Sequence, residues 1–180
     1  LLEFFNITKK INNLILKIFI STFFIIAPIL IIYMIKTELN NGENLLTFLF
    51  LIVSINDVFA YLIGSKIGKI KALKVSPNKT IEGFFGGIIS CVIIGPLLIK
   101  LLNINLEINS FVLSLLISIF GIIGDLLESY LKRKFNKKDS GTILMSHGGI
   151  LDRVDSILFC APFFYLIIKL KYFRVLLSEK

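Results

Sequence analysis

Long apolar runs separated by short charged connections constrain the fold of this chain more than any other feature. Of its 180 residues, 56% are hydrophobic, and the mean hydropathy is +0.87. Soluble globular domains contain about 45–50% apolar residues, and several of these runs reach the roughly 20 residues that a helix needs to cross a bilayer. We therefore expect residues 1–180 to form a single domain of the all-α class, a polytopic helical bundle integral to a membrane.

Five of the apolar runs are expected to cross the membrane. They cover residues 18–35, 45–63, 83–102, 111–127 and 154–170. Pro28 interrupts the first run and Pro96 lies within the third, and neighbouring helices in a membrane can accommodate such prolines. Cys91 and Cys160 also lie in these runs, and we expect them to be buried as small hydrophobic side chains.

Positive charge is concentrated in two of the connections. Residues 64–80 contain five lysines and no acidic residue, and residues 132–138 contain five more lysine or arginine residues. In residues 36–44 and 100–108 a single lysine is balanced by acidic residues. Because basic loops stay on the cytoplasmic side, we expect both basic loops to face the cytoplasm and the protein to lie in the cell membrane.

The C-terminal tail does not follow this pattern. Lys169, Lys171 and Arg174 would lie on the opposite side if all five segments crossed the membrane. Either the tail is an exception or one segment is re-entrant, and the sequence leaves both interpretations open.

The net charge of +8 favours an anionic partner. The sequence contains no soluble basic domain that could hold a duplex, so we expect no nucleic-acid partner. Membrane lipid or a polyanionic small molecule is the expected partner instead.

The densest polar cluster of the chain lies between the last two apolar runs. Residues 129–155 contain six Lys or Arg, three Asp, the single His and a Gly-Gly pair. Clustered cations suit phosphate groups and carboxylates suit a divalent cation, while glycines let backbone N–H groups approach phosphate closely. Basic juxtamembrane runs also contact anionic lipid headgroups, and that interpretation stays open for the cations taken alone.

Helical spacing places several of these side chains on common faces. Asp125, Ser129 and Lys132 follow the spacing i, i+4, i+7 and share a face at the end of the fourth run, while Asp152 and Asp155 share one at the start of the fifth. Acids at these two helix ends could converge on one Mg²⁺, which takes one or two protein carboxylates together with phosphates and water. Alternatively, they pair with nearby arginines at a helix end.

His147 is the single histidine, which excludes a multi-histidine metal site. It would orient a phosphate or make a structural hydrogen bond. Upstream, Asp57 places an ionisable group inside an apolar run, which is rare and usually functional. Ser76–Thr80 are expected to form a turn that fixes Lys79. The glycines that follow at 83, 86 and 87 favour close helix packing over ligand contact.

Two sequence patterns carry a family resemblance. The longer reads Ser129-x-Leu131-Lys132-Arg133-x4-Lys138-Asp139-x-Gly141 and then His147-Gly148-Gly149-x2-Asp152-Arg153-x-Asp155. Upstream are Asp57-x2-Ala60-Tyr61-x2-Gly64 and Ser76-Pro77-Asn78-Lys79-Thr80-x-Glu82-Gly83. These patterns resemble the signature and a second conserved region of the phosphatidate cytidylyltransferases, or CDP-diacylglycerol synthases. The match covers more than half of the chain, with its most specific part in residues 125–155.

The resemblance implies a polytopic membrane enzyme that makes CDP-diacylglycerol and pyrophosphate from CTP and phosphatidic acid. It implies Mg²⁺ held by Asp125 and Asp152, and leaves room for a second cation, a homodimer and missing N-terminal helices. The catalytic residues expected on this basis are Lys132, Arg133, Lys138, Asp139 and His147. The expected substrate-binding residues are Ser129, Asp57, Lys79, Gly148, Gly149, Arg153 and Asp155.

Two other functions remain as alternatives. A CTP-dependent polyprenol or phytol kinase would use the same nucleotide but would yield CDP instead of pyrophosphate. An ion-coupled transporter could use Asp57 and Asp125 as coupling carboxylates, although transporters place such charges near the membrane midplane between repeats. Release of pyrophosphate from CTP would separate the three functions.

Overall fold

A computed structural model describes residue 18 and residues 22–73, 76–106, 108–134 and 151–178 of the chain. Its elements, in order, are η2 (Thr22–Ile26), α3 (Ala27–Glu38), α4 (Gly42–Ile67), β1 (Lys71–Leu73), β2 (Ser76–Thr80), α5 (Ile81–Leu101), α6 (Ser110–Lys134) and α7 (Leu151–Ser178). Helices dominate, and one short antiparallel hairpin joins α4 to α5. The expected all-α membrane bundle is confirmed, with this hairpin as an addition.

Within the described residues, α4, α5 and α6 are long and apolar enough to cross a membrane. They correspond to the second, third and fourth predicted segments, and α7 contains the fifth. The first predicted segment is divided between a π-helical turn and α3, because Pro28 lies in the first turn of α3, where its missing N–H breaks no helical hydrogen bond. Since α3 has only 12 residues, the count of five crossing segments is approximate.

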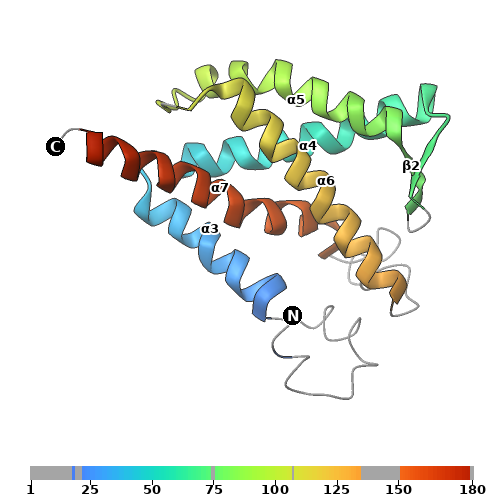
Figure 1. The fold of residues 1–180 in the computed structure, drawn as a ribbon, viewed down its shortest axis with the longest axis horizontal. Coiled ribbons are helices and arrows are strands. Elements are labelled where there is room, and N and C mark those ends of the chain that lie inside the picture. The colour runs from blue at the N-terminus through green and yellow to red at the C-terminus, as the bar shows by residue number, and fades with distance from the viewer. Residues whose placement is uncertain (1–17, 19–21, 74–75, 107, 135–150, 179–180) are drawn as a thin grey trace.

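The helices pack around one apolar core. α4 and α5 lie side by side, α6 packs against α5 and α7, and α3 packs against α4 and α7 (Figure 1). The fully buried side chains of this core include Phe48, Leu113, Ile117 and Phe164. The outer face of α5 is apolar as well, with exposed side chains every fourth residue at Phe85, Ile89, Ile93, Leu97 and Leu101. An apolar core inside an apolar surface is what a bundle surrounded by lipid requires.

Glycines allow α4 and α5 to approach closely, as the sequence indicated. A Cβ atom at Gly87 would lie 2.7 Å from Oδ1 and 2.8 Å from the backbone oxygen of Asn56, and one at Gly86 would meet the side chain of Ile63. Cys91 and Cys160 are buried, as expected. Their Sγ atoms lie 3.3 and 3.5 Å from backbone oxygens of neighbouring helices.

Gly87→Ala is expected to destabilise the bundle by about 1–3 kcal/mol, because the new methyl group must push the backbone of α4 away. Thermal unfolding in detergent would measure the loss. Gly121→Ala is the matched control, since its Cβ would meet Cys160 and Asn56 only at 3.7 and 3.9 Å. An equal melting temperature for the two variants would contradict the close contact between α4 and α5.

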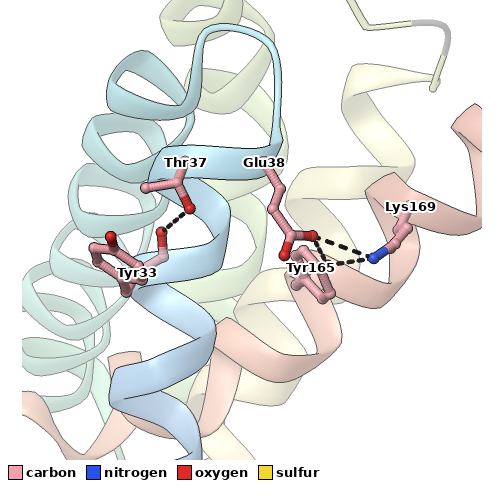
Figure 2. A network of polar contacts seen from close by, with 5 residues as sticks. All are labelled: Tyr33, Thr37, Glu38, Tyr165 and Lys169. Atoms are coloured by element: carbon pink, nitrogen blue, oxygen red, sulfur yellow. Dashed lines mark hydrogen bonds and ion pairs between the residues drawn. The ribbon is translucent and has the colours of Figure 1, made fainter.

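A polar network ties α3 to α7 at the end of the bundle away from the hairpin (Figure 2). Tyr165 Oη donates to Glu38 Oε2 at 2.6 Å, and Lys169 Nζ donates to Tyr165 Oη at 2.6 Å and to Glu38 Oε2 at 3.3 Å. On α3 itself, Thr37 Oγ1 donates to the Tyr33 carbonyl at 3.0 Å. The network fixes the second half of α7 beside the C-terminal end of α3.

Candidate active site

The hairpin between α4 and α5 sets the position of Lys79. Residues 76–80 form strand β2 instead of the expected turn. The Ile81 N–H donates to the Ile70 carbonyl at 3.0 Å, and the Ile70 N–H donates to the two carboxylate oxygens of Glu82 at 3.1 and 3.3 Å. Glu82 lies in the first turn of α5, where the free N–H groups of the helix favour a carboxylate. The hairpin is thereby fixed to the start of α5.

The end of α4 and the start of α5 both contact Thr80. Its Oγ1 caps α5 by accepting from the Gly83 N–H at 3.2 Å. Cβ atoms at Gly64, Gly68 and Gly83 would lie 2.8, 2.5 and 3.0 Å from this Oγ1, so only glycine fits there without a shift. The three glycines therefore enclose Thr80 and hold the preceding residue, Lys79, in place.

A cavity of about 590 Å³ lies beside the hairpin, among α4, α5, α6 and α7. Among the described residues, its charged lining consists of Asp57 on α4, Lys79 on β2, Asp125 on α6 and Asp155 on α7. The ammonium of Lys79 forms an ion pair with Asp125, and each of these side chains is 26% exposed. Four elements thus bring opposite charges together in this cavity. The hairpin and the end of α6 that contribute to it lie at the same end of the bundle (Figure 1).

Several charges act on Lys79. Burial lowers its pKa, and the carboxylates of Asp155 and Asp57 raise it without fully offsetting burial. Lys132 lowers the pKa further, while Glu128 raises it. The charges of α6 therefore lie close enough to affect the cavity. A cation in such partly dry surroundings binds anionic groups more strongly than a surface cation does.

Lys132 and Glu128 form an ion pair one helical turn apart on α6, and both side chains are only 12% exposed. Glu128 and Asp155 also line a second, mostly apolar cavity of about 190 Å³ between α6, α7 and the start of α3. In contrast, Arg133 and Lys134 are exposed at the end of α6. The basic run therefore contains both a buried and a solvent-facing part.

The structure groups some of the predicted site residues. Asp57, Lys79, Asp125 and Asp155 line one cavity, and Lys132 lies close enough to act on Lys79. Ser129 and Arg133 lie on α6 but not in the lining of this cavity. Asp152 and Arg153 belong to the first turn of α7, although their side chains lie outside the description. The other predicted residues, Lys138, Asp139, His147, Gly148 and Gly149, lie outside the described residues.

Among the polar lining residues that have no role assigned from the sequence are Asn56, Thr80 and Ser156. Asn56 is buried beside Asp57, and its Oδ1 lies 3.9 Å from Cys91 Sγ. Because Asn56 is an amide next to an aspartate inside an apolar run, the sequence alone could have marked it as a candidate site residue. Thr80 and Ser156 carried no such signal, since their importance comes from helices that pack beside them.

The model of the cytidylyltransferase family matches residues 2–171, almost the whole chain. The chain belongs to the cytidylyltransferase family. Among curated members, the phosphatidate cytidylyltransferase of Staphylococcus epidermidis is 49% identical over 127 residues, covering 68% of this chain and 48% of the relative. Those of Staphylococcus aureus and Staphylococcus haemolyticus are 48% and 46% identical, each with the same coverage. The chain spans about half the length of these relatives.

The cytidylyltransferase resemblance implies Mg²⁺, and the cavity provides ligands that suit it. Although three aspartates line this cavity, no three His, Cys, Asp or Glu side chains of the described part of the chain lie close enough together to hold a metal ion by themselves. Mg²⁺ needs only one or two protein carboxylates where phosphate and water oxygens complete its octahedron. Asp125 supplies such an oxygen and already holds a cation, the ammonium of Lys79. The donor set therefore fits Mg²⁺.

Proposed function

We propose that this chain carries the catalytic core of a phosphatidate cytidylyltransferase, which transfers CMP from CTP to phosphatidic acid. The single observation that carries the proposal is the convergence of Lys79, Asp125, Asp57 and Asp155 on one cavity at the end of an apolar bundle. Cations for phosphates and carboxylates for a metal are the groups that this reaction needs. Named relatives at 46–49% identity over 68% of the chain support the same activity.

The reaction joins two polyanions. A phosphate oxygen of phosphatidic acid forms a bond to the α-phosphorus of CTP, while the bond from that phosphorus to the oxygen bridging it to the β-phosphate breaks. The electron pair leaves with pyrophosphate, and CDP-diacylglycerol remains. The attacking oxygen is already anionic at neutral pH, so the protein need not supply a nucleophile. Its task is to align two groups that repel each other.

The roles of the side chains follow from their charges. Lys79 and Lys132 neutralise phosphate charge as fixed cations, and Glu128 orients Lys132. Asp125 and Asp152 are the proposed ligands of Mg²⁺, which when bound draws charge from the phosphate oxygens. Arg133, Lys138 and His147 complete the phosphate site in this proposal. The roles expected for the remaining residues of the signature, a second cation and a homodimer stay predictions.

The proposed orientation places the cavity and both basic loops on the cytoplasmic side of the membrane. CTP would then enter from the aqueous side, and phosphatidic acid from the surrounding lipid. Lys169 would lie on the opposite side, which is unfavourable for an isolated positive charge. Its ion pair with Glu38 at 3.3 Å balances that charge, so Lys169 adds little to the excess of positive charge in the C-terminal tail.

The variants Lys71→Cys and Asn136→Cys are expected to resist an impermeant thiol reagent added to intact cells, because both positions would be cytoplasmic. Asn105→Cys, in the exposed connection between α5 and α6, should be labelled from outside. All three variants are made in a background without Cys91 and Cys160. External labelling at Lys71→Cys would overturn the orientation.

Pyrophosphate release from CTP tests the proposed function directly. The purified chain, given CTP, phosphatidic acid and Mg²⁺, is expected to release one pyrophosphate for each CDP-diacylglycerol formed, and chelation of the metal should stop both. Formation of CDP with a phosphorylated polyprenol would indicate the kinase instead. Turnover without phosphatidic acid would contradict the proposal.

A further inference from the structure

The ion pair between Lys79 and Asp125 is held in place from both sides. Lys79 lies on strand β2 of a hairpin that is fixed to α5, and its neighbour Thr80 is enclosed by three glycines. Both charged side chains are about three-quarters buried. This is therefore a positioned contact, unlike a surface lysine that samples many partners.

The pair neutralises charges that are costly to bury alone. An unpaired carboxylate in a partly buried site is unfavourable, and one paired with an ammonium is much less so. The same cavity contains Asp57 and Asp155 in addition to Asp125, so its described lining carries three carboxylates against the single ammonium of Lys79. This excess of acidic groups attracts a cation of higher charge than an ammonium.

A divalent cation and the ammonium of Lys79 compete for the same carboxylate. Mg²⁺ binds oxygen at about 2.0–2.1 Å in a strict octahedron, and its double charge repels an adjacent ammonium. When the metal binds Asp125, Lys79 must therefore move away. The cavity in which it lies is the one assigned to the phosphates of the substrate, so a phosphate oxygen is the partner available to it.

We propose that Lys79 is an internal counter-ion of Asp125, which a divalent cation displaces and which then binds a phosphate group of the nucleotide. The inference rests on the proposed function and adds a thermodynamic linkage between metal binding and nucleotide binding. Metal binding frees the ammonium of Lys79 to bind phosphate, and phosphate binding keeps this ammonium away from Asp125. By thermodynamic reciprocity, each event favours the other by the same factor.

Direct binding of Mn²⁺, measured by electron paramagnetic resonance on the detergent-purified protein without nucleotide, tests the competition. Lys79→Gln is expected to bind Mn²⁺ at least about fivefold more tightly than the parent, because the competitor is gone. Lys79→Arg keeps the charge and should bind about as weakly as the parent. Lys71→Gln removes an exposed charge from the same hairpin and should leave the affinity unchanged.

A second readout separates this role from a structural one. Lys79→Gln should raise the KM for CTP and lower the Kd for Mn²⁺. Loss of a merely structural lysine would not change these two constants in opposite directions. Unchanged or weaker Mn²⁺ binding by Lys79→Gln, with binding lost in Asp125→Asn, would overturn the inference and leave the metal assignment intact. Unchanged binding in Asp125→Asn would overturn both.

Discussion

Asp125→Asn is expected to lower the turnover of CTP and phosphatidic acid at least about a hundredfold, while the protein still inserts and purifies. The substitution keeps the size of the side chain and removes the charge that pairs with Lys79. In the proposed mechanism it also removes a metal ligand, and neutralising such a ligand forfeits several kcal/mol of transition-state stabilisation. The measurement is the rate of pyrophosphate release at saturating Mg²⁺.

Glu43→Gln is the matched control for this variant. Glu43 is also paired with a lysine, Lys36 at 3.2 Å, but its side chain is 77% exposed and lies at the other end of α4. Exposed ion pairs contribute little, so near-parental turnover is expected. Asp152→Asn should behave like Asp125→Asn, on the strength of the sequence alone. If Asp125→Asn kept more than half of the parental rate, the site would be misplaced.

The helices could be predicted from the sequence because each apolar run specifies its own burial in lipid. Their ends could not. α4 continues past the predicted end at 63 to Ile67, since Gly64 packs against Thr80 from a neighbouring element. α6 continues to Lys134 because polar residues on its last turns pair with one another and basic side chains suit a helix C-terminus. Hydropathy alone records neither contact.

Helical spacing could place Asp125 and Lys132 on one face, but it could not identify their partners. Lys79 is remote from Asp125 in the sequence, and the two meet only because the hairpin that joins α4 to α5 places Lys79 beside α6. The base of the hairpin is held by Glu82, whose carboxylate accepts from the Ile70 N–H. A short segment rich in lysine carries no strand pattern, so the sequence favoured a simple turn.

Lys132→Gln is expected to reduce kcat/KM for CTP at least about tenfold, whereas Lys134→Gln should stay within about twofold of the parent. A charge-assisted contact with phosphate in a partly dry site contributes about 1.5–3 kcal/mol. An exposed juxtamembrane lysine adds only about 1 kcal/mol of membrane affinity, which a protein with several apolar helices does not need. Lys132 is 12% exposed and Lys134 is exposed at the helix end.

The contact between Lys132 and Glu128 requires one further variant, because Lys132→Gln leaves a buried carboxylate without this partner. That defect alone could unfold α6 and imitate a catalytic loss. The double variant Glu128→Gln/Lys132→Gln removes the stranded charge, so its melting temperature should return toward that of the parent. Its activity should not recover, since the cation that the proposed mechanism assigns to the phosphates is still missing. Recovery of activity in the double variant would show that Lys132 serves only to neutralise Glu128, and equal mild effects at Lys132 and Lys134 would assign the whole basic run to lipid headgroups.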